Sequence, residues 1–156
     1  MNDILRKCNA YSYFTKLDIL IQYYTFYLDK ESKDLCTITT PFGKFKYTRQ
    51  HMGLKCSPNF AQEVMDNIFH DVDDADVYID DVGAFSNDWQ HYIKLIDTIV
   101  QRLQENGSTI NPLRCNWAIQ KIDWLGYWLT PTGLKPWKKK IEAVLQLEPP
   151  KKLEHL

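Results

Sequence analysis

The stretch Asp76-Val77-Tyr78-Ile79-Asp80-Asp81-Val82-Gly83-Ala84-Phe85 decides the fold of this chain. Apolar and aromatic residues flank a pair of aspartates, a pattern that predicts two short strands joined by an acidic turn. Such a turn needs no function, because aspartate favours turns and is well solvated there. Two adjacent carboxylates also repel each other, so a pair held beside buried strands is typical of a cation site. Both interpretations stay open on these residues alone.

A third carboxylate lies far away in the sequence, at the end of another apolar stretch. Phe14-Thr15-Lys16-Leu17-Asp18 has the composition of a strand that closes on aspartate, a residue that strands disfavour. Two divalent ions about 3.5–4 Å apart need more carboxylates than one pair supplies. We therefore expect Asp18 to converge with Asp80 and Asp81 at the edge of one antiparallel sheet. At least one of the three carboxyls should have a raised pKa, because clustered like charges favour protonation.

Two amphipathic helices are predicted around the acidic stretch. Ser57 followed by Pro58 predicts a helix start, with serine as N-cap and proline at the first helical position. The two helices are predicted at Ser57–His70 and Asp88–Gln104, and we expect both to cover the sheet. The residues predicted for their apolar faces are Phe60, Ala61, Val64, Met65, Ile68 and Phe69 in the first helix, and Trp89, Tyr92, Ile93, Ile96, Ile99, Val100 and Leu103 in the second.

The remaining segments complete an α+β domain. The order of predicted elements is β, ββ, α, ββ, α, β, α, which is typical of helices packed on an antiparallel sheet. The segments are a strand over Thr15–Leu28 that breaks into a short helix near Gln22, a hairpin over Cys36–Thr40 and Lys44–Thr48, a strand over Ile122–Leu129, and a helix over Lys138–Leu147.

Composition excludes several classes of protein. With 44% hydrophobic and 25% charged residues and a mean hydropathy of -0.42, the chain is neither disordered nor membrane-spanning. The formal net charge of -1 gives no indication of a nucleic-acid partner. The four cysteines form no C-x-x-C pair, which argues against a zinc knuckle or a redox dithiol. No signal peptide is recognisable, so we expect an intracellular protein with no membrane partner.

Several motifs of the chain, taken in order and with their approximate spacing, resemble those of the reverse transcriptases. The similarity is greatest to the Pol polyproteins of gypsy-type long-terminal-repeat retrotransposons, and it runs from Phe14 to Pro150. The motifs that carry the resemblance are Lys16-Leu17-Asp18, Phe42-Gly43-Lys44-Phe45, Gly53-Leu54-Lys55-Cys56-Ser57-Pro58 through Gln62, Tyr78-Ile79-Asp80-Asp81, Asn111-Pro112-Leu113-Arg114-Cys115, Leu125-Gly126 and Gly133-Leu134-Lys135-Pro136.

This resemblance implies an RNA-directed DNA polymerase domain that transfers a dNTP to a primer 3′-hydroxyl. Residues 1–150 would form the palm, an antiparallel sheet packed by helices, with part of the fingers; the thumb would be absent, and residues 151–156 would begin a downstream region. Asp18, Asp80 and Asp81 would be catalytic and would hold two Mg²⁺ ions, with Mn²⁺ as a substitute. The implied partners are an RNA or DNA template with its primer, the dNTP, and the remaining fingers, thumb and ribonuclease H regions of Pol.

The resemblance also implies five substrate-binding residues. Tyr23 would lie under the sugar of the incoming nucleotide and exclude a 2′-hydroxyl; the alternative is a tyrosine of a core strand. Gly53 and Gln62 would lie against the template and the nascent base pair, and Tyr78 belongs to the motif of the paired aspartates. Arg114 stands where the family commonly has lysine, and a guanidinium does not readily give up a proton.

Two further departures from the family pattern affect local geometry. Gln22 stands where the family has glycine, and His51-Met52 stands where it has Pro-Phe. Two other interpretations therefore stay open: a catalytically inactive remnant of a retroelement, and a non-enzymatic module that binds metal or another protein. We also expect exposed apolar surface around Phe14, Tyr24, Trp128 and Leu147, where further regions would dock.

Overall fold

A four-stranded antiparallel sheet forms the centre of the chain, with strand order β4-β5-β1-β6. The structure is a computed structural model, and it describes residues 11–145. The two central strands pair over their whole length, from Tyr13 opposite Ser86 to Asp18 opposite Asp81. The strands of this sheet are β1 (Tyr13–Asp18), β4 (Ala75–Tyr78), β5 (Asp81–Ser86) and β6 (Asn116–Ile119).

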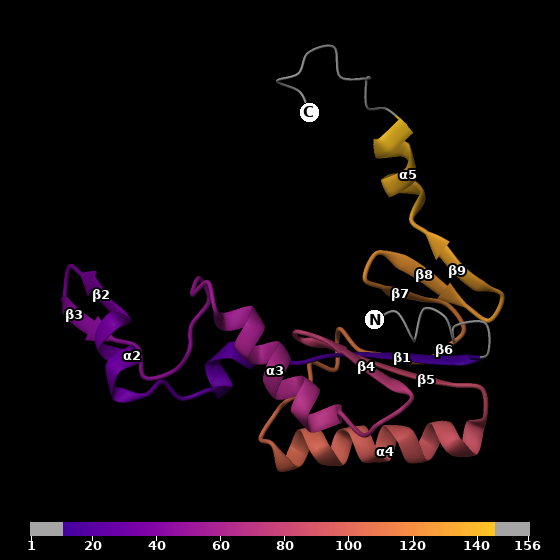
Figure 1. The fold of residues 1–156 in the computed structure, drawn as a ribbon, viewed down its shortest axis with the longest axis horizontal. Coiled ribbons are helices and arrows are strands. Elements are labelled where there is room, and N and C mark those ends of the chain that lie inside the picture. The colour runs from indigo at the N-terminus through magenta and orange to yellow at the C-terminus, as the bar shows by residue number, and fades with distance from the viewer. Residues whose placement is uncertain (1–10, 146–156) are drawn as a thin grey trace.

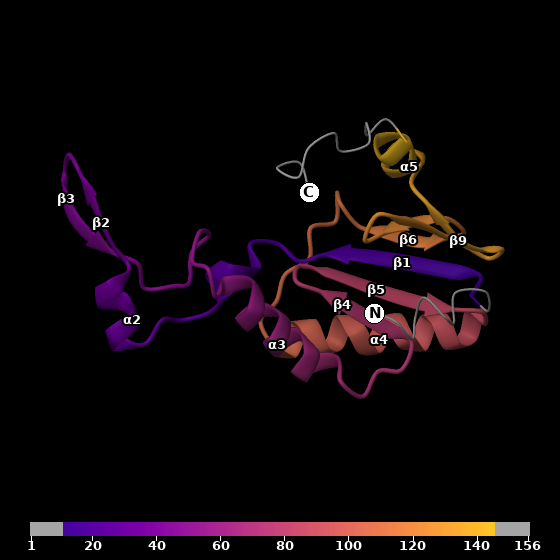
Figure 2. The same cartoon turned by 45° about the horizontal axis from the view of Figure 1, so that its top comes forward.

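Helices α3 (Ser57–Phe69) and α4 (Trp89–Glu105) cover one face of this sheet (Figure 2). Leu17 of β1 and Val82 of β5 point to this face and are fully buried. Thr15 adds a buried hydrogen bond of 2.7 Å between its hydroxyl and that of Tyr92 on α4. The core on this side consists of Leu17, Ile19, Met65, Phe69, Val82, Ala84, Leu95, Ile99 and Leu103.

A second, three-stranded sheet packs on the opposite face. It consists of β7 (Ile122–Trp124), β8 (Tyr127–Thr130) and β9 (Gly133–Pro136), and α5 (Lys138–Leu145) follows it (Figure 1). The core on this side consists of Tyr11, Phe14, Phe85, Ile122, Trp124 and Leu129. This apolar cover lies at the end of the central strands where Phe14 pairs with Phe85.

A hairpin and a short helix project from this body (Figures 1 and 2). They are α2 (Lys30–Leu35), β2 (Thr37–Thr40) and β3 (Gly43–Lys46). Nearly all residues of the hairpin are exposed, including Phe42 and Phe45. A single 3-10 turn over Gln22–Thr25 connects β1 to this projecting part. Within the described residues, no helix has the length and apolar character needed to cross a bilayer.

The structure confirms the α+β class, both long helices and the two hairpins around residues 41–43 and 79–80, and it corrects two strands. The strand predicted over Thr15–Leu28 ends at Asp18, and Ile21 adopts a left-handed backbone (φ 46°). The short helix predicted near Gln22 is confirmed as the 3-10 turn over Gln22–Thr25. The strand predicted over Ile122–Leu129 is instead the hairpin β7-β8, which turns at Leu125-Gly126 with φ values of 53° and 81°. Helix α2 and strands β6 and β9 were not predicted. The end of the helix predicted over Lys138–Leu147 lies outside the described residues.

Three predictions about individual side chains are also wrong. Ser57 is the first residue of α3 and not its N-cap; its hydroxyl donates to the carbonyl of His51 over 3.3 Å. The buried face of α4 is formed by Tyr92, Leu95, Ile99 and Leu103, whereas Trp89, Ile93 and Val100 are exposed. Phe14 is fully buried, because the β7-β9 sheet covers the part of the surface where we expected exposure. Leu147 lies outside the described residues.

Gly83 is the residue that lets the β7-β9 sheet approach the central sheet. A Cβ atom at this position would lie 2.6 Å from Cζ of Phe85 and 3.0 Å from Cη2 of Trp124. We expect Gly83→Ala to lower the free energy of unfolding by about 1–3 kcal/mol, because the added methyl group overpacks this contact. Urea denaturation followed by circular dichroism measures the change.

The double variant Gly83→Ala with Phe85→Leu is the control for this cause. Leucine removes the Cζ atom that clashes, so the loss in the double variant should be smaller than the sum of the two single losses. Additive losses would contradict the steric explanation.

Candidate active site

The register of β1 and β5 places Asp18 directly opposite Asp81. Directly paired residues of antiparallel strands point to the same side, so the two carboxylates share one face of the sheet. Their neighbours Leu17 and Val82 face the helices, so Asp18 and Asp81 face the other side. Their side chains are 15% and 21% exposed, respectively. A half-buried pair of carboxylates thus lies on the sheet face opposite α3 and α4.

The turn that carries Asp80 is held by the amide of Gln62 on α3. Ile79, with φ 55°, donates its backbone N–H to Oε1 of Gln62 over 2.8 Å. Nε2 of Gln62 donates to the carbonyl of Val77 (3.1 Å) and to Asp66 (2.8 Å). The carbonyl of Asp80 also accepts the N–H of Ile19 over 2.8 Å. Gln62, predicted to contact the template, therefore makes its hydrogen bonds inside the protein, where they fasten the acidic turn.

Two cationic side chains lie against the carboxylates. Nζ of Lys16 lies 2.6 Å from Oδ2 of Asp81, and Nη1 of the largely exposed Arg114 lies 3.6 Å from Oδ2 of Asp18. Burial raises the pKa of the Asp81 carboxyl; the ion pair with Lys16 opposes this shift, and the charges of Asp80 and Asp18 add to it. The expected raised pKa is thus confirmed, but burial contributes more to it than the clustering of like charges does.

The three carboxylates do not form a closed metal site. Within residues 11–145, no three Asp, Glu, His or Cys side chains are grouped so that they could hold an ion. Lys16 occupies one oxygen of Asp81, and Asp80 lies in the turn and not on the paired strands. The donor set itself suits Mg²⁺, since all three side chains offer carboxylate oxygens. The residues fit the ion by their chemistry, and the side chains of Lys16 and Asp80 would have to move.

Two tyrosines border this carboxylate site. Tyr23 lies in the 3-10 turn and is partly exposed, not in a core strand. Burial, and secondly the charge of Asp80, raise the pKa of the Tyr23 hydroxyl, which places this ring within electrostatic reach of Asp80. Tyr78 pairs with Asp81 at the start of the hairpin and is 47% exposed. Tyr78 thus lies on the same face of the sheet as Asp81, and the charge of Asp80 reaches Tyr23.

Gln22 and Gly53 differ in how well the structure accounts for them. Gln22 is buried, and neither polar atom of its side-chain amide has a hydrogen-bond partner among the described residues. Gly53 has φ 100°, and no atom lies within 4 Å of the position that a Cβ would take. Glycine is needed there for this left-handed backbone conformation and not for close packing, since no other part of the protein comes close.

A polar cavity of about 340 Å³ opens beside Asp18. Sequence reasoning missed two of its cations, Lys16 and Lys121. Lys16 was recognisable, because it lies two residues before Asp18 and strand side chains alternate with period two. For Lys121, no spacing to a predicted site residue indicated that it would line the cavity. The cavity is lined by Lys16, Asp18, Arg114, Asn116, Ile119, Lys121, Ile122, Asp123 and Trp128.

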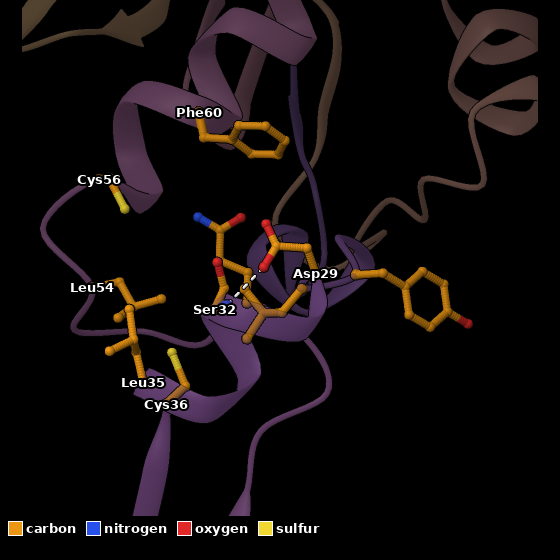
Figure 3. Close-up of a pocket in the computed structure, with 10 residues that line it drawn as sticks. Asp29, Ser32, Leu35, Cys36, Leu54, Cys56 and Phe60 are labelled. Atoms are coloured by element: carbon orange, nitrogen blue, oxygen red, sulfur yellow. Dashed lines mark hydrogen bonds between the residues drawn. The ribbon is translucent and has the colours of Figure 1, made fainter.

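A separate pocket of about 370 Å³ lies between α2 and the start of α3 (Figure 3). Its walls are largely apolar, with Leu35, Leu54 and Phe60 among them. Asp29 at its rim accepts the backbone N–H of Ser32 over 2.7 Å and so caps α2. None of the three carboxylates of the site lines this pocket.

The family described as "Reverse transcriptase (RNA-dependent DNA polymerase)" matches residues 2–129. The chain belongs to the reverse transcriptase family. This reverse transcriptase domain is 27% identical to the "Retrovirus-related Pol polyprotein from transposon 412" of Drosophila melanogaster over 92% of its own length. It is 25% identical to the "Transposon Tf2-3 polyprotein" of Schizosaccharomyces pombe over its whole length. The resemblance to retrotransposon Pol polyproteins is thus confirmed, and the chain spans 12% of the length of each of these two relatives.

Solved structures of foamy viral protease-reverse transcriptase share the fold of this reverse transcriptase domain. One, described as a complex with ds DNA, has a TM-score of 0.84 and 18% identity and covers 99% of this chain and 27% of that chain. Another, described as a complex with an RNA/DNA hybrid, has a TM-score of 0.78 and 17% identity and covers 92% of this chain and 20% of that chain. At these identities the likeness shows the fold.

Gln62→Met tests whether this amide holds the acidic turn of the reverse transcriptase domain. Methionine keeps the length of the side chain but leaves the N–H of Ile79 and the carbonyl of Val77 without their partner. We expect a loss of about 1–3 kcal/mol in the free energy of unfolding, measured by urea denaturation.

Gln101→Met is the matched control. Gln101 bonds only to Glu105, four residues along the exposed face of α4, just as Gln62 bonds to Asp66. Its replacement should cost less than about 0.5 kcal/mol. Equal losses in the two variants would contradict the role of Gln62 in the turn.

Proposed function

We propose that this chain supplies the catalytic centre of an RNA-directed DNA polymerase, which adds a dNTP to the 3′-hydroxyl of a primer. The observation that carries the proposal is the register of β1 and β5, which sets Asp18 opposite Asp81 on the face away from the helices. Membership of the reverse transcriptase family supports the reaction class. Residues 1–150 would be the palm with part of the fingers, and residues 151–156 would begin the next region.

Asp18, Asp80 and Asp81 would hold Mg²⁺ or Mn²⁺ in this reaction. When bound, a pair of such ions lowers the pKa of the primer hydroxyl and neutralises the triphosphate and the leaving pyrophosphate. The protein prepares the site by keeping the carboxylates half-buried and by fixing the acidic turn through Gln62. Lys16 neutralises Asp81 in the present arrangement and would release it on loading.

Other residues of the chain would position the substrates. Tyr23, next to the acidic turn, would lie under the sugar of the dNTP, and Tyr78 would border the same place. Arg114 is largely exposed beside Asp18 and would stabilise phosphate charge without giving up a proton. Gly53 would face the template, and the turn at Leu125-Gly126 would position the primer end.

The proposed partners are a primed template, the dNTP and further Pol regions. The foamy viral structures are described as complexes with an RNA/DNA hybrid and with ds DNA, and this likeness supports a duplex partner. Because the chain spans only 12% of the two polyproteins, we propose that fingers, thumb and ribonuclease H regions complete the working enzyme. Positioning supplies much of the rate of phosphoryl transfer, so the isolated chain should extend primers slowly.

The Lys16–Asp81 ion pair and the absence of a closed three-carboxylate group in residues 11–145 favour one alternative, a catalytically inactive remnant of a retroelement. Primer extension separates it from the proposal. The assay uses a poly-A template with oligo-dT and Mg²⁺, on the chain and on a version extended by flanking Pol regions.

Asp80→Asn should reduce the extension rate by on the order of a hundredfold, because one charged oxygen at the reacting phosphate is lost. Asp97→Asn, an equal change at an exposed position on α4, should leave the rate unchanged. A complete absence of extension in the longer version would favour the inactive remnant, and extension at an undiminished rate in Asp80→Asn would remove Asp80 from the catalytic centre.

Tyr23→Ala should allow ribonucleotides to be incorporated, because the smaller side chain leaves room for a 2′-hydroxyl. The measurement is the ratio of kcat/KM for dTTP and UTP in the extended version, and we expect it to fall by about tenfold or more. Tyr24→Ala is the matched control, since Tyr24 is its exposed neighbour. A ratio that changes equally in both variants would remove Tyr23 from sugar selection.

A further inference from the structure

The β7-β9 sheet has an outer face that points away from the core. Leu129 is buried against the central sheet, so its neighbour Trp128 points to the opposite side. Lys135 of β9 pairs directly with Trp128 and therefore lies beside it on this outer face. A cavity of about 490 Å³ lies here, and we call it the tryptophan pocket; it is lined by Lys121, Trp128, Lys135, Pro136, Trp137 and Lys138.

The tryptophan pocket concentrates positive charge in a chain whose net charge is -1. Its lining contains Lys121, Lys135 and Lys138 and no carboxylate. None of these three lysines makes an ion pair with a carboxylate of residues 11–145. Nζ of Lys121 lies 4.2 Å from the centre of the Trp128 ring, which holds this ammonium group at the pocket. The charge therefore suits an anionic ligand.

An indole in the same lining lacks a hydrogen-bond partner. Nε1 of Trp137 is buried and meets no acceptor among the described residues. The indole nitrogen is a donor only, and leaving such a group buried without a partner costs about 1–3 kcal/mol. This nitrogen is closed to solvent here, so the Trp137 ring would have to turn for a phosphate oxygen to reach it; that oxygen would satisfy the donor and would also pair with the lysines. The indole rings of Trp128 and Trp137, with centroids 6.3 Å apart, offer apolar surface for the sugar and base attached to that phosphate.

The tryptophan pocket shares two lining residues, Lys121 and Trp128, with the cavity beside Asp18. That neighbouring cavity contains two further cations, Lys16 and Arg114. A nucleic-acid strand that leaves the carboxylate site on this side would thus pass one cation after another. Indole rings stack on the free faces of unpaired bases, so this chemistry fits an unpaired nucleotide.

We propose that the tryptophan pocket binds one nucleotide of a single-stranded nucleic acid, outside the carboxylate site. The lysines hold its phosphate, the N–H of Trp137 donates to a phosphate oxygen, and the indole rings contact its sugar and base. This inference rests on the proposed function only in taking nucleic acid as the partner. It requires neither metal ions nor a reaction.

The test follows the indole N–H signals of the ¹⁵N-labelled chain by NMR while a 12-nucleotide oligo-dT is added, at low salt and without metal or dNTP. The chain has five tryptophans, and Trp137→Phe identifies the signal of Trp137. We expect that signal to move on binding. The signal of Trp89, which lies on α4 across the central sheet, should stay in place.

Affinity and its salt dependence, measured by fluorescence anisotropy of the labelled oligo-dT, form the second part of the test. Trp137→Phe keeps an aromatic ring but loses the donor, so binding should weaken by about tenfold; Trp89→Phe should have no effect. Lys135→Gln should reduce the slope of log K against log salt by about 0.7, as expected for one lost phosphate contact to a single strand. Lys94→Gln, an equal change at an exposed position of α4, is the matched control.

Three results would overturn the inference. The first is no binding by the unmodified chain, and the second is binding by the Trp137→Phe and Lys135→Gln variants that equals binding by the unmodified chain. The third is tighter binding of dTTP than of the oligonucleotide at the indole of Trp137. Circular dichroism of each variant shows whether it is folded, and Lys138→Gln replaces any variant that is not. Asp80→Asn separates this inference from the proposed function, because it should slow extension by on the order of a hundredfold, whereas the indole signal of Trp137 should still move when the oligonucleotide is added. If the chain binds the oligonucleotide through Trp137 but its extended version never extends a primer, only the proposed polymerase function is refuted, and the inference about the tryptophan pocket stands.

Discussion

The antiparallel pairing of β1 with β5 is the constraint on which the rest of the structure depends. Because side chains alternate along both strands, one register divides them between two environments. Leu17 and Val82 enter the core beneath the helices, whereas Asp18 and Asp81 face the other side. A slip of one residue would move the carboxylates into the apolar core and Leu17 out of it, at a prohibitive cost in burial. The hydrophobic effect of the core therefore places the polar site.

The face that carries the carboxylates is itself divided along its length. At one end Phe14 and Phe85 are buried under the β7-β9 sheet, and Gly83 lets Trp124 approach closely. At the other end the face remains polar, with Lys16 paired to Asp81. The cover thus excludes water from one side of the site and leaves the other side accessible. That asymmetry explains why burial dominates the raised pKa of Asp81 although the neighbouring cavity is open and polar.

The sequence predicted those parts of the fold that local patterns encode. The acidic turn, both long helices and the meeting of Asp18 with Asp81 follow from alternation, helical spacing and the order of the motifs. Helix α2 was missed, because it is six residues long and buries none of them, so no apolar spacing marks it. The turn at Leu125-Gly126 was hidden inside an apolar run, and β6 forms only through pairing with β1. The ion pair of Lys16, the hydrogen bonds of Gln62 and the pocket around Trp137 arise from contacts between distant segments, which no local pattern records.

The net charge of -1 does not describe the electrostatics of the site, because what matters is where the charges lie. A cluster of three aspartates repels a polyanion, and within a Debye length of about 8 Å at physiological salt this repulsion is only partly screened. Lys16 and Arg114 lie against two of these aspartates and reduce the repulsion at that point. The tryptophan pocket adds further positive charge beyond the carboxylates, from Lys121, Lys135 and Lys138. A nucleic acid would therefore meet attraction beside the acidic turn and repulsion at it, so its backbone is drawn along the flank of the site while the carboxylates stay available for cations.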